Sequence, residues 1–379
     1  MNRIKYFVSY DTVDNKSENR IYVPAATSKI DYIVEILNRN GYAVDLVSIS
    51  QTANNSLYRG SLKKIGINTL QLFPTTPRGG IVKKTINQIV MRIAILCYMI
   101  SNIKEHEVVM IYHSVATMWI FRFLKYCKKC KIIEEVEELY GDVYDSAKLK
   151  RKEIRTVSKA DAFIIPTFKL DSVVNFNNKL SVLIHGIYRP ERKIANTRND
   201  GVIHCVYAGT LDPRKGSIEA VESAEYLDER YYIHILGFGS KDQIDNLCGV
   251  IDRVQKLTTC KVSYDGYLQG DDFLKSIQSC HIGLVTQKID ADYNDTSFPS
   301  KIMMYLCNGL QVVCVNIPAV NESVIASNIV FCESDSAVSI AQAIKSINPD
   351  ENQEIELIKE LDEDFSDNIS SVLKVLSQR

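Results

Sequence analysis

The stretch "NDTSFPSKIMMYLCNGLQVV", residues 294–313, decides how the surrounding chain folds. It reads as a polar loop, a short helix, an Asn-Gly stop and an apolar strand. We expect Pro299 in the first helical turn and Asn308-Gly309 at a left-handed helix end. Residues 311–315 have the β-branched, apolar composition of a buried strand. Because free backbone N–H groups point outward where a helix begins, this stretch predicts a bound anion at the helix start.

The same alternation of strand and helix extends in both directions from this stretch. In the first half we expect strands at 3–10, 42–49, 107–113, 130–138 and 161–167, and helices at 28–38, 81–101, 117–129 and 147–159. In the second half we expect strands at 202–211, 231–239, 261–268 and 281–287, with helices between them. Apolar strands that alternate with helices predict an α/β protein with doubly wound parallel sheets.

Two features divide the chain near residue 190. A polar segment, 180–201, interrupts the alternation. Residues 1–195 hold 30 Lys and Arg against 18 Asp and Glu, a net charge of +12, and the remainder has a net charge of −13, which together give the −1 of the whole chain. We therefore predict an N-terminal Rossmann-like domain over 1–189, a second Rossmann-like domain over 190–360, and a C-terminal helix over 361–379 that crosses back to the first domain.

Composition narrows the class of protein. A hydrophobic content of 46% with 24% charged residues is that of a soluble globular protein. Several of the ten cysteines lie in apolar runs (Cys97, Cys205, Cys280, Cys307, Cys314), which predicts buried thiols in a reducing cytosol. The one C-x-x-C, Cys127 to Cys130, has no second pair at zinc spacing. No signal peptide precedes the first strand, and the apolar run 89–100 is too short to span a membrane, so we expect a cytoplasmic protein.

The basic first half indicates an anionic partner. The helices at 81–101 and 147–159 suggest a peripheral contact with an anionic membrane surface, and a phosphorylated acceptor is the alternative. Two differently charged solvated surfaces would explain the same split. We expect no nucleic-acid partner.

Four loops in the second half follow the carboxyl ends of its strands, where open α/β sheets bind ligands. They are "YAGTLDPRKGS" (207–217), "ILGFGS" (235–240), "YDGYLQGDD" (264–272) and the stretch at 294–301. In this order they resemble the C-terminal half of GT-B glycosyltransferases of the family 4 type, over roughly residues 202–330. The resemblance implies a GT-B fold and a nucleotide-sugar donor, UDP- or GDP-linked, with neither a metal nor a cofactor.

The resemblance also implies a set of donor-binding residues. Lys215 and Arg214 hold the diphosphate, backbone amides of Ser297–Lys301 cap it, and the loop Tyr264–Leu268 lies near the base. The full predicted set is Gly209, Thr210, Arg214, Lys215, Gly237, Gly266, Tyr267, Ser297, Phe298, Ser300 and Lys301.

Three positions depart from the family pattern. Thr210 replaces the usual Arg, and Thr296 and Met304 occupy the places of the Glu-x7-Glu pair, whose second Glu contacts the donor ribose. The wording "FPSK" looks like a subgroup of bacterial polysaccharide glycosyltransferases, in which Ser300 and Lys301 supply the missing diphosphate contacts. A lysine in a first helical turn is disfavoured by the helix dipole, which also points to an anionic partner.

In the first half, "KIIEEVEELYGD" (131–142) places four carboxylates at and beyond a strand end. Because side chains alternate across a strand and like charges repel, we expect some of the four glutamates at 134, 135, 137 and 138 to meet cations. By resemblance, Glu137 and Glu138 are the catalytic candidates, at the place where many family members have a histidine, with Asp142 nearby. The alternative is that these glutamates are structural, at the end of a strand where the lysines of 125–131 balance their charge.

Three further features are interpreted as structural. His113 ends a strand and is a second candidate for the cleft, but a lone histidine at a strand end is more often structural, and His185 resembles a hinge residue before the second domain. Asp290-x-Asp292 looks like the metal-binding pair of GT-A enzymes, but in this context solvated loop acids are the better interpretation.

The resemblance implies a retaining, metal-independent hexosyltransferase. It would move a sugar from a nucleotide donor to a hydroxyl of a glycan, lipid-linked and part of a surface polysaccharide. A catalytically degenerate GT-B protein that serves as a partner or glycan-binding subunit is the alternative, because the Glu pair is missing. A sugar-nucleotide epimerase or a phosphorylase of GT-B shape is a third possibility.

Overall fold

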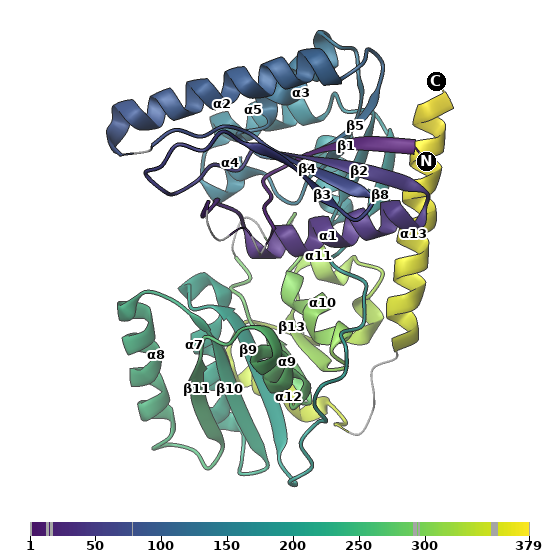
Figure 1. The fold of residues 1–379 in the computed structure, drawn as a ribbon. Coiled ribbons are helices and arrows are strands. Elements are labelled where there is room, and N and C mark those ends of the chain that lie inside the picture. Colours follow the sequence, from purple (N-terminus) through teal and green to yellow (C-terminus); the bar gives the residue numbers. More distant parts are fainter. Residues whose placement is uncertain are drawn as a thin grey trace. The chain divides into compact units, whose positions relative to one another are not determined.

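The structure is a computed structural model of the 379-residue chain, and it describes residues 2–12, 15, 18–77, 79–290, 294, 296–349 and 355–378. The chain forms two compact units (Figure 1). Unit 1 comprises Met1–Pro166, Leu170–Ile184 and Asp364–Arg379, and unit 2 comprises Thr167–Lys169 and His185–Glu363.

Unit 1 is built on an eight-stranded sheet in the order β3-β4-β2-β1-β5-β6-β7-β8, in which only β3 runs antiparallel to its neighbour. Its strands are β1 (Asn2–Val8), β2 (Tyr42–Ser48), β3 (Ser61–Ile65), β4 (Asn68–Leu72), β5 (Val108–Tyr112), β6 (Lys131–Glu135), β7 (Ala162–Ile165) and β8 (Leu180–Leu183). The helices of this part of the chain are α1 (Pro24–Arg39), α2 (Gly80–Asn102), α3 (Met118–Tyr126), α4 (Tyr140–Val143), α5 (Ala147–Val157) and α6 (Phe168–Val174).

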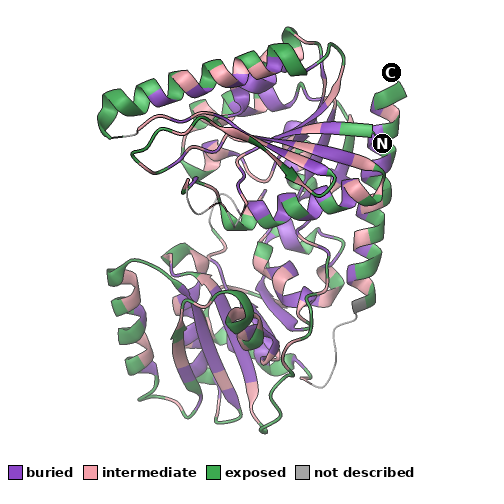
Figure 2. Cartoon of the chain, viewed as in Figure 1, coloured by how far each residue is buried: buried purple, intermediate pink, exposed green. Residues whose placement is uncertain are grey.

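Helices α2 and α3 cover one face of this sheet with apolar side chains. The resulting core includes Phe7, Val109, Ile111, Ile132, Phe163, Met91, Ile95, Met99, Phe121 and Leu124, all at most 3% exposed. Figure 2 shows the consequence, since the strands are mostly buried while the helices keep exposed outer faces. Burial of apolar side chains from both layers stabilises the sheet and thereby fixes its carboxyl edge.

The last helix, α13 (Ile355–Gln378), belongs to unit 1 from residue 364 onward. The Phe365 ring packs against that of Tyr32 in α1 with 6.0 Å between centroids, and the Asn40 amide donates to the Ser366 hydroxyl over 2.8 Å. Val372, Leu373 and Leu376 of this helix are buried.

Unit 2 has a six-stranded, all-parallel sheet in the order β11-β10-β9-β12-β13-β14. Its strands are β9 (Ile203–Thr210), β10 (Tyr231–Phe238), β11 (Lys261–Gly266), β12 (Ile282–Val285), β13 (Gln311–Val315) and β14 (Ile329–Cys332). Its helices are α7 (Ser217–Glu222), α8 (Lys241–Val254), α9 (Gly270–Gln278), α10 (Ser300–Cys307), α11 (Pro318–Asn321) and α12 (Ala337–Ser346), with short 3-10 helices at Pro213–Lys215, Ser223–Tyr226 and Ala326–Asn328.

The predicted fold class is confirmed, because both sheets are doubly wound. The strand order reverses between β1 and β5 in unit 1 and between β9 and β12 in unit 2. Ligands of open α/β sheets bind beyond the carboxyl ends of the strands at such reversal points. The predicted loops at 207–217 and 294–301 follow β9 and β12, the two strands on either side of the reversal in unit 2.

The stretch at 294–313 folds largely as its sequence indicates. It forms α10 and then β13, whose five residues are all buried, and Gly309 between them has φ +81°. Pro299 is the exception, since it lies one residue before α10 rather than in its first turn. A proline there still fits, because its missing N–H leaves no orphan donor.

Other differences concern sheet edges and one helix. The segment 180–201, predicted as a polar break, contains the edge strand β8, and the β3–β4 hairpin at the opposite edge was not predicted. Edge strands carry polar side chains such as Lys63 and Lys64, so they lack the apolar pattern by which a strand is recognised in a sequence. Strand β6 ends at Glu135 rather than at residue 138. Cys97 was expected to be buried and is exposed, because it lies on the outer side of α2.

Candidate functional site

Lys301 occupies the centre of the carboxyl edge of unit 2. Its ammonium lies 3.6 Å from the ring centroid of Tyr207 in β9, a cation–π contact. Within the described residues it makes no hydrogen bond or ion pair. Burial, and secondarily the charge of Lys215, lower the pKa of Lys301 well below its usual value. An anion bound here would relieve the repulsion between the two ammonium groups.

Glycines make room for this arrangement. A Cβ on Gly209 would lie 2.7 Å from the Lys301 ammonium nitrogen, and one on Gly237 would lie 1.8 Å from the Gly209 carbonyl oxygen. Gly216 has φ +80°, and its Cβ would lie 1.8 Å from the Thr286 carbonyl oxygen. The first two let β9 and β10 end side by side with Lys301 above them, and the third docks the turn that carries Lys215 onto the end of β12.

Helix α10 is held rigidly behind Lys301. The Tyr305 hydroxyl, one turn along, accepts from the Ala208 N–H over 2.8 Å, and the Tyr305 ring lies where a Cβ on Gly283 would stand. Lys301 and Tyr305 of α10 therefore both contact β9, and this packing fixes the position of Lys301 before any ligand binds.

The loop before α10 supplies an unsatisfied hydroxyl. The Ser297 Oγ is buried and has no hydrogen-bond partner among the described residues. Phe298 stacks on the His185 ring with 4.5 Å between centroids, while Ser300 is exposed at the helix start, where no side chain of the described residues caps the helix. A buried orphan donor costs free energy, so this loop is arranged to receive an acceptor group.

Two exposed aromatic rings follow the ends of β10 and β11. Tyr267, predicted from the sequence, is 57% exposed and meets Phe238, 52% exposed, edge to face with 5.1 Å between centroids. Gly266 before Tyr267 has φ +80°, and the Tyr264 hydroxyl donates to the Gly237 carbonyl over 3.0 Å. Sequence reasoning missed Phe238, although its place inside the Gly-x-Gly of "ILGFGS" was a signal.

The remaining predicted residues of this edge differ in their contacts and burial. The guanidinium of Arg214 folds back on Asp212 in the same 3-10 turn, with Nη2 2.7 Å from the carboxylate. Thr210 closes β9, and its carbonyl accepts from the Tyr207 hydroxyl over 2.8 Å. At the places of the family's Glu pair, Thr296 is buried, its carbonyl accepting from Thr167, and Met304 is half-buried.

In unit 1 the glutamates of β6 point to opposite faces, as alternation predicts. Glu134 joins a buried network in which His113 lies between it and Glu153, at 3.3 Å and 3.0 Å. Against the effect of burial, these two carboxylates raise the pKa of His113 to about 9. Glu153 also accepts from the backbone N–H groups of Tyr140 and Gly141 at the start of α4, so this network fixes the loop between β6 and α4.

The candidate catalytic carboxylates, Glu137 and Glu138, lie just beyond the end of β6, near Glu135 on its other face. Glu135 is fully buried, and burial together with the nearby Glu137 raises the pKa of Glu135 well above its usual value, which favours its neutral form. Glu137 forms an ion pair with Lys29 of α1, a residue that the sequence did not single out. Glu138 is half-buried beside it, and Tyr112 ends the neighbouring strand β5, where burial and the Glu137 charge raise the pKa of its phenol.

The described residues hold no group of three or more His, Cys, Asp or Glu side chains that could bind a metal ion. Cys127 is exposed and Cys130 is buried. Of the Asp290-x-Asp292 pair, Asp292 lies outside the described residues.

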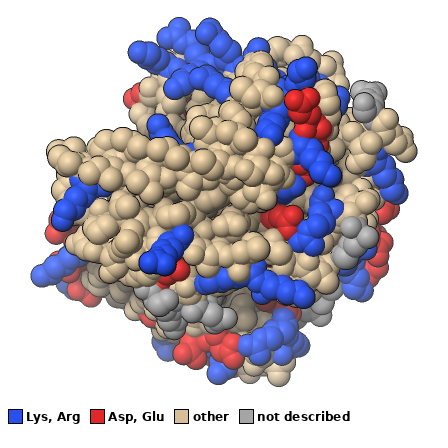
Figure 3. Space-filling model, turned by 45° about the horizontal axis from the view of Figure 1, so that its top comes forward, with Lys and Arg blue, Asp and Glu red and all other residues tan. Residues whose placement is uncertain are grey.

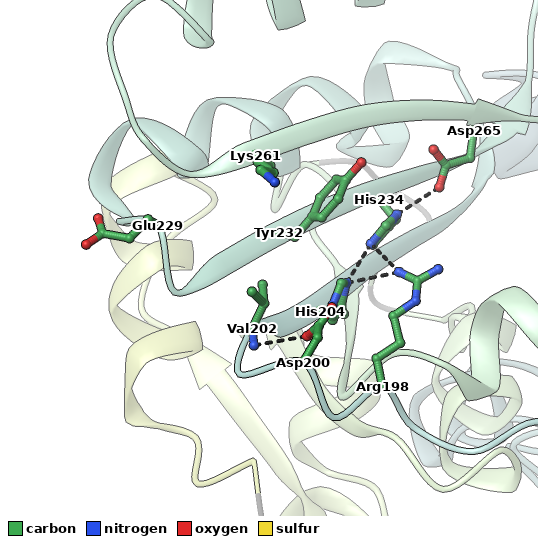
Figure 4. A pocket seen from close by; sticks show the side chains of 9 residues that line it. All are labelled: Arg198, Asp200, Val202, His204, Glu229, Tyr232, His234, Lys261 and Asp265. Atoms are coloured by element: carbon green, nitrogen blue, oxygen red, sulfur yellow. Dashed lines mark hydrogen bonds and ion pairs between the residues drawn. The ribbon is translucent and has the colours of Figure 1, made fainter.

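Unit 2 also has a polar cavity of about 530 Å³ near the amino ends of β9 and β10 (Figure 4). Its floor holds the buried rings of His204 and His234, and the Arg198 Nη1 lies 3.0 Å from a nitrogen of each. Asp200 contacts the outer nitrogen of His204 and Asp265 that of His234. This network fastens the segment before β9 to the sheet, at the opposite end of the strands from Lys301.

Comparison with known proteins gives a fold but no sequence family. No family model and no curated protein matches the chain. A solved α,α-trehalose 6-phosphate synthase from Burkholderia multivorans has a TM-score of 0.69 at 9% identity and covers 100% of this chain and 97% of its own. The fold is GT-B.

Two further structures with this fold carry ligands. A UDP-forming α,α-trehalose-phosphate synthase from Burkholderia xenovorans, in complex with glucose-6-phosphate, has a TM-score of 0.64 at 11% identity, and the match covers 99% of this chain and 100% of that one. An E. coli trehalose-6-phosphate structure bound with UDP-2-fluoro glucose also has a TM-score of 0.64 at 11% identity, with 100% and 99% covered. The two α/β units of this chain thus have the GT-B fold of these structures.

Proposed function

We propose that the protein is a glycosyltransferase that moves a sugar from a nucleotide donor to a hydroxyl of a glycan. One observation carries the proposal, namely that Lys301 stands over Gly209 with its ammonium unpaired among the described residues and its pKa lowered. A diphosphate is the ligand that this edge fits best, because its negative charge would pair with the Lys301 ammonium and reduce the repulsion that Lys215 exerts on it.

Departure of the sugar leaves negative charge on the diphosphate, and Lys301 and Lys215 would neutralise it. The buried Ser297 hydroxyl and the start of α10, with Ser300, would donate to its oxygens. Cations and N–H groups are sufficient for this task, so the proposal needs no metal. Arg214 can join them by leaving Asp212, to which it is held at the surface.

Different protein groups would contact the base and the ribose of the donor. Phe238 and Tyr267 offer an exposed aromatic surface on which a base can stack, with backbone around Gly237 and Gly266 open to its edge. Ribose recognition falls to backbone and to the loop near Thr296, because the Met304 thioether is a poor hydrogen-bond acceptor.

We place acceptor chemistry at the carboxyl edge of unit 1. Glu137, with Glu138 beside it, would accept a proton from the attacking hydroxyl or stabilise positive charge at the anomeric carbon, and the ion pair with Lys29 would hold the Glu137 side chain in place. We further propose that the donor carries a hexose and that transfer retains its configuration. The acceptor would be lipid-linked and part of polysaccharide synthesis at the inner face of a membrane. A sugar phosphate, such as the one that the Burkholderia xenovorans enzyme binds, is a rival acceptor.

Met304, which occupies the place of the glutamate that contacts the donor ribose in the family pattern, favours a second candidate function. A GT-B protein that has lost ribose recognition would serve as a non-catalytic partner or glycan-binding subunit.

Calorimetry with UDP, GDP and their sugar conjugates separates the two functions. The transferase predicts micromolar binding of one nucleotide class and slow hydrolysis of its sugar conjugate, detected by mass spectrometry. Acceptor panels of glycans, lipid-linked sugars and glucose-6-phosphate then identify the acceptor. Absence of nucleotide binding would contradict the transferase and support the second function.

A further inference from the structure

Helix α2 of unit 1 has two apolar faces. Its inner face packs on the sheet through Asn87, Met91, Ile95 and Met99, all at most 3% exposed. A second set lies on the opposite side of the helix and follows spacings of four, three, four and seven residues: Val82, Ile86, Ile89, Ile93 and Ile100, between 48% and 73% exposed.

We propose that this outer face of α2 binds the surface of an anionic membrane. The stripe runs over 19 residues, about 27 Å along the helix axis. Figure 3 shows the extent of the uncharged surface, with Lys and Arg at its margins. Single exposed aliphatic residues are ordinary, but a continuous row of them marks an interaction surface.

The charge of the helix identifies the partner as anionic. Residues 80–102 contain no Asp or Glu, while Lys83 and Arg92 lie on either side of the stripe and Lys84 lies at the same end of the helix as Lys83. The whole first half, residues 1–195, has a net charge of +12. Lysines at the rim of an apolar stripe are the pattern of helices that lie in the interface plane and contact acidic headgroups.

A second copy of the chain is the competing occupant, because the spacing also suits a two-helix seam. In such a pair the two helices would bring like charges together, with no acidic residue of either α2 to offset Lys83, Lys84 and Arg92. An acidic bilayer offers the opposite charge along the entire stripe, so we commit to the membrane.

The helix lies on the membrane and does not cross it. No helix in the described part of the chain is long and apolar enough to span a bilayer. Docking through α2 deepens the proposed function, on which it rests only for the lipid-linked acceptor, and it would hold the protein where such an acceptor resides.

Flotation with lipid vesicles tests the proposal on the full chain. We expect binding to phosphatidylcholine vesicles that contain 30% phosphatidylglycerol and at least tenfold weaker binding to pure phosphatidylcholine. The double variant Ile89→Ser/Ile93→Ser should lose at least tenfold in vesicle affinity, and Lys83→Gln/Lys84→Gln should weaken binding to the acidic vesicles. The matched control is Leu257→Ser, an aliphatic residue in unit 2 that is 62% exposed and should leave binding unchanged.

Failure of docking and failure of the proposed function remain distinguishable. The α2 variants should keep the wild-type circular dichroism and nucleotide affinity, because the changed side chains face solvent. Equal flotation of the Ile89→Ser/Ile93→Ser variant, or no flotation of the wild type, would overturn the proposal. So would a lipid-free dimer in analytical ultracentrifugation that the same double variant dissociates, because the second copy would then be the occupant.

Discussion

The carboxyl edges of the two sheets have opposite chemistry on the same type of scaffold. In unit 2 the edge is opened by glycines and holds Lys301 and Lys215. In unit 1 the edge holds Glu135 and Glu137, packed among buried side chains. Strand order and winding place a site at each edge, and the residue types then decide its charge. An edge with surplus cations selects an anion, whereas an edge with surplus carboxylates orients hydroxyls and accepts protons.

Removal of the central cation should give the largest effect. Lys301→Gln should reduce donor turnover by about 10³-fold, since one preorganised donor to a developing charge is worth about 10²–10³. Nucleotide affinity should fall as well. The measurement is mass-spectrometric turnover together with calorimetry, and Lys275→Gln, on the exposed side of α9, is the control. Unchanged nucleotide binding by Lys301→Gln would show that the diphosphate lies elsewhere.

The acidic edge should respond differently. Glu137→Gln should reduce transfer to the acceptor by about 10²-fold, because general base catalysis contributes about 10²–10⁴. Nucleotide affinity should stay at the wild-type level, since Glu137 belongs to unit 1. Lys29→Met is a companion variant that leaves Glu137 without its ion-pair partner. Equal loss of nucleotide affinity and transfer would contradict this division of roles.

The sequence predicts the cationic edge better than the acidic one, for a physical reason. Gly209 and Gly237 lie at the carboxyl ends of β9 and β10, and Lys301 lies in the first turn of α10, so their place follows from strand-loop-helix order alone. The pairing of Glu137 with Lys29 joins residues 108 positions apart, and only the packing of α1 reveals it. The exposed Phe238 and the His204 network likewise depend on which neighbouring strands pair.

The same contrast holds for the fold. Long apolar strands in the sheet interiors were predicted to within a few residues, because burial on both faces makes them continuous apolar runs. Strands β3 and β8 were missed because they are edges, where polar side chains are tolerated, and the interior strand β4 was missed with its hairpin partner because it is short and only alternate residues are buried. The Asn-Gly after α10 was correctly predicted as the helix end, since Gly309 needs its left-handed conformation.

A larger residue in place of Gly237 at the cationic edge should destabilise unit 2. Gly237→Ala places a Cβ 1.8 Å from the Gly209 carbonyl oxygen, and such overpacking costs about 2–3 kcal/mol. Urea denaturation measures the free energy of unfolding. The control is Gly249→Ala in α8, where no atom lies within 4 Å of the new Cβ and the change should stabilise the helix by about 0.5–1 kcal/mol. Equal stability of the two variants would refute the steric argument.

The buried network behind the acidic edge should make stability depend on alkaline pH. The folded-state pKa of His113, about 9, exceeds its ordinary value of 6.5, so its ion pairs contribute fully below pH 6.5 and are lost as pH rises through 9. We expect a loss on the order of 2 kcal/mol over that range. Comparison with Glu153→Gln tests this, since the variant should lose most of that slope while the glutamine can still accept from the N–H groups of α4.

The histidines of unit 2 should show the opposite dependence, with a smaller amplitude. Burial lowers the pKa of His204 below 6.5, and the charge of Arg198 lowers it further, while Asp200 acts in the other direction. Stability from this group is therefore full above pH 6.5 and falls as pH drops below it. The amplitude should be smaller than that of His113, because the contact with Asp200 offsets part of the effect of burial.

Thermal unfolding between pH 5 and 7 measures this effect. His204→Asn should flatten the acid side of the profile, whereas His106→Asn, on an exposed turn of unit 1, should leave it unchanged. The acid loss should also weaken the hold on Arg198, because a proton on the His204 ring removes one of the two nitrogens that accept from its guanidinium. Proteolysis of the segment before β9 should then accelerate at pH 5 in the wild type. A cleavage rate that is the same at pH 5 and pH 7 would mean that the histidines do not hold this segment, and that its other contacts, such as the Arg198 N–H to the Ser279 carbonyl, are sufficient.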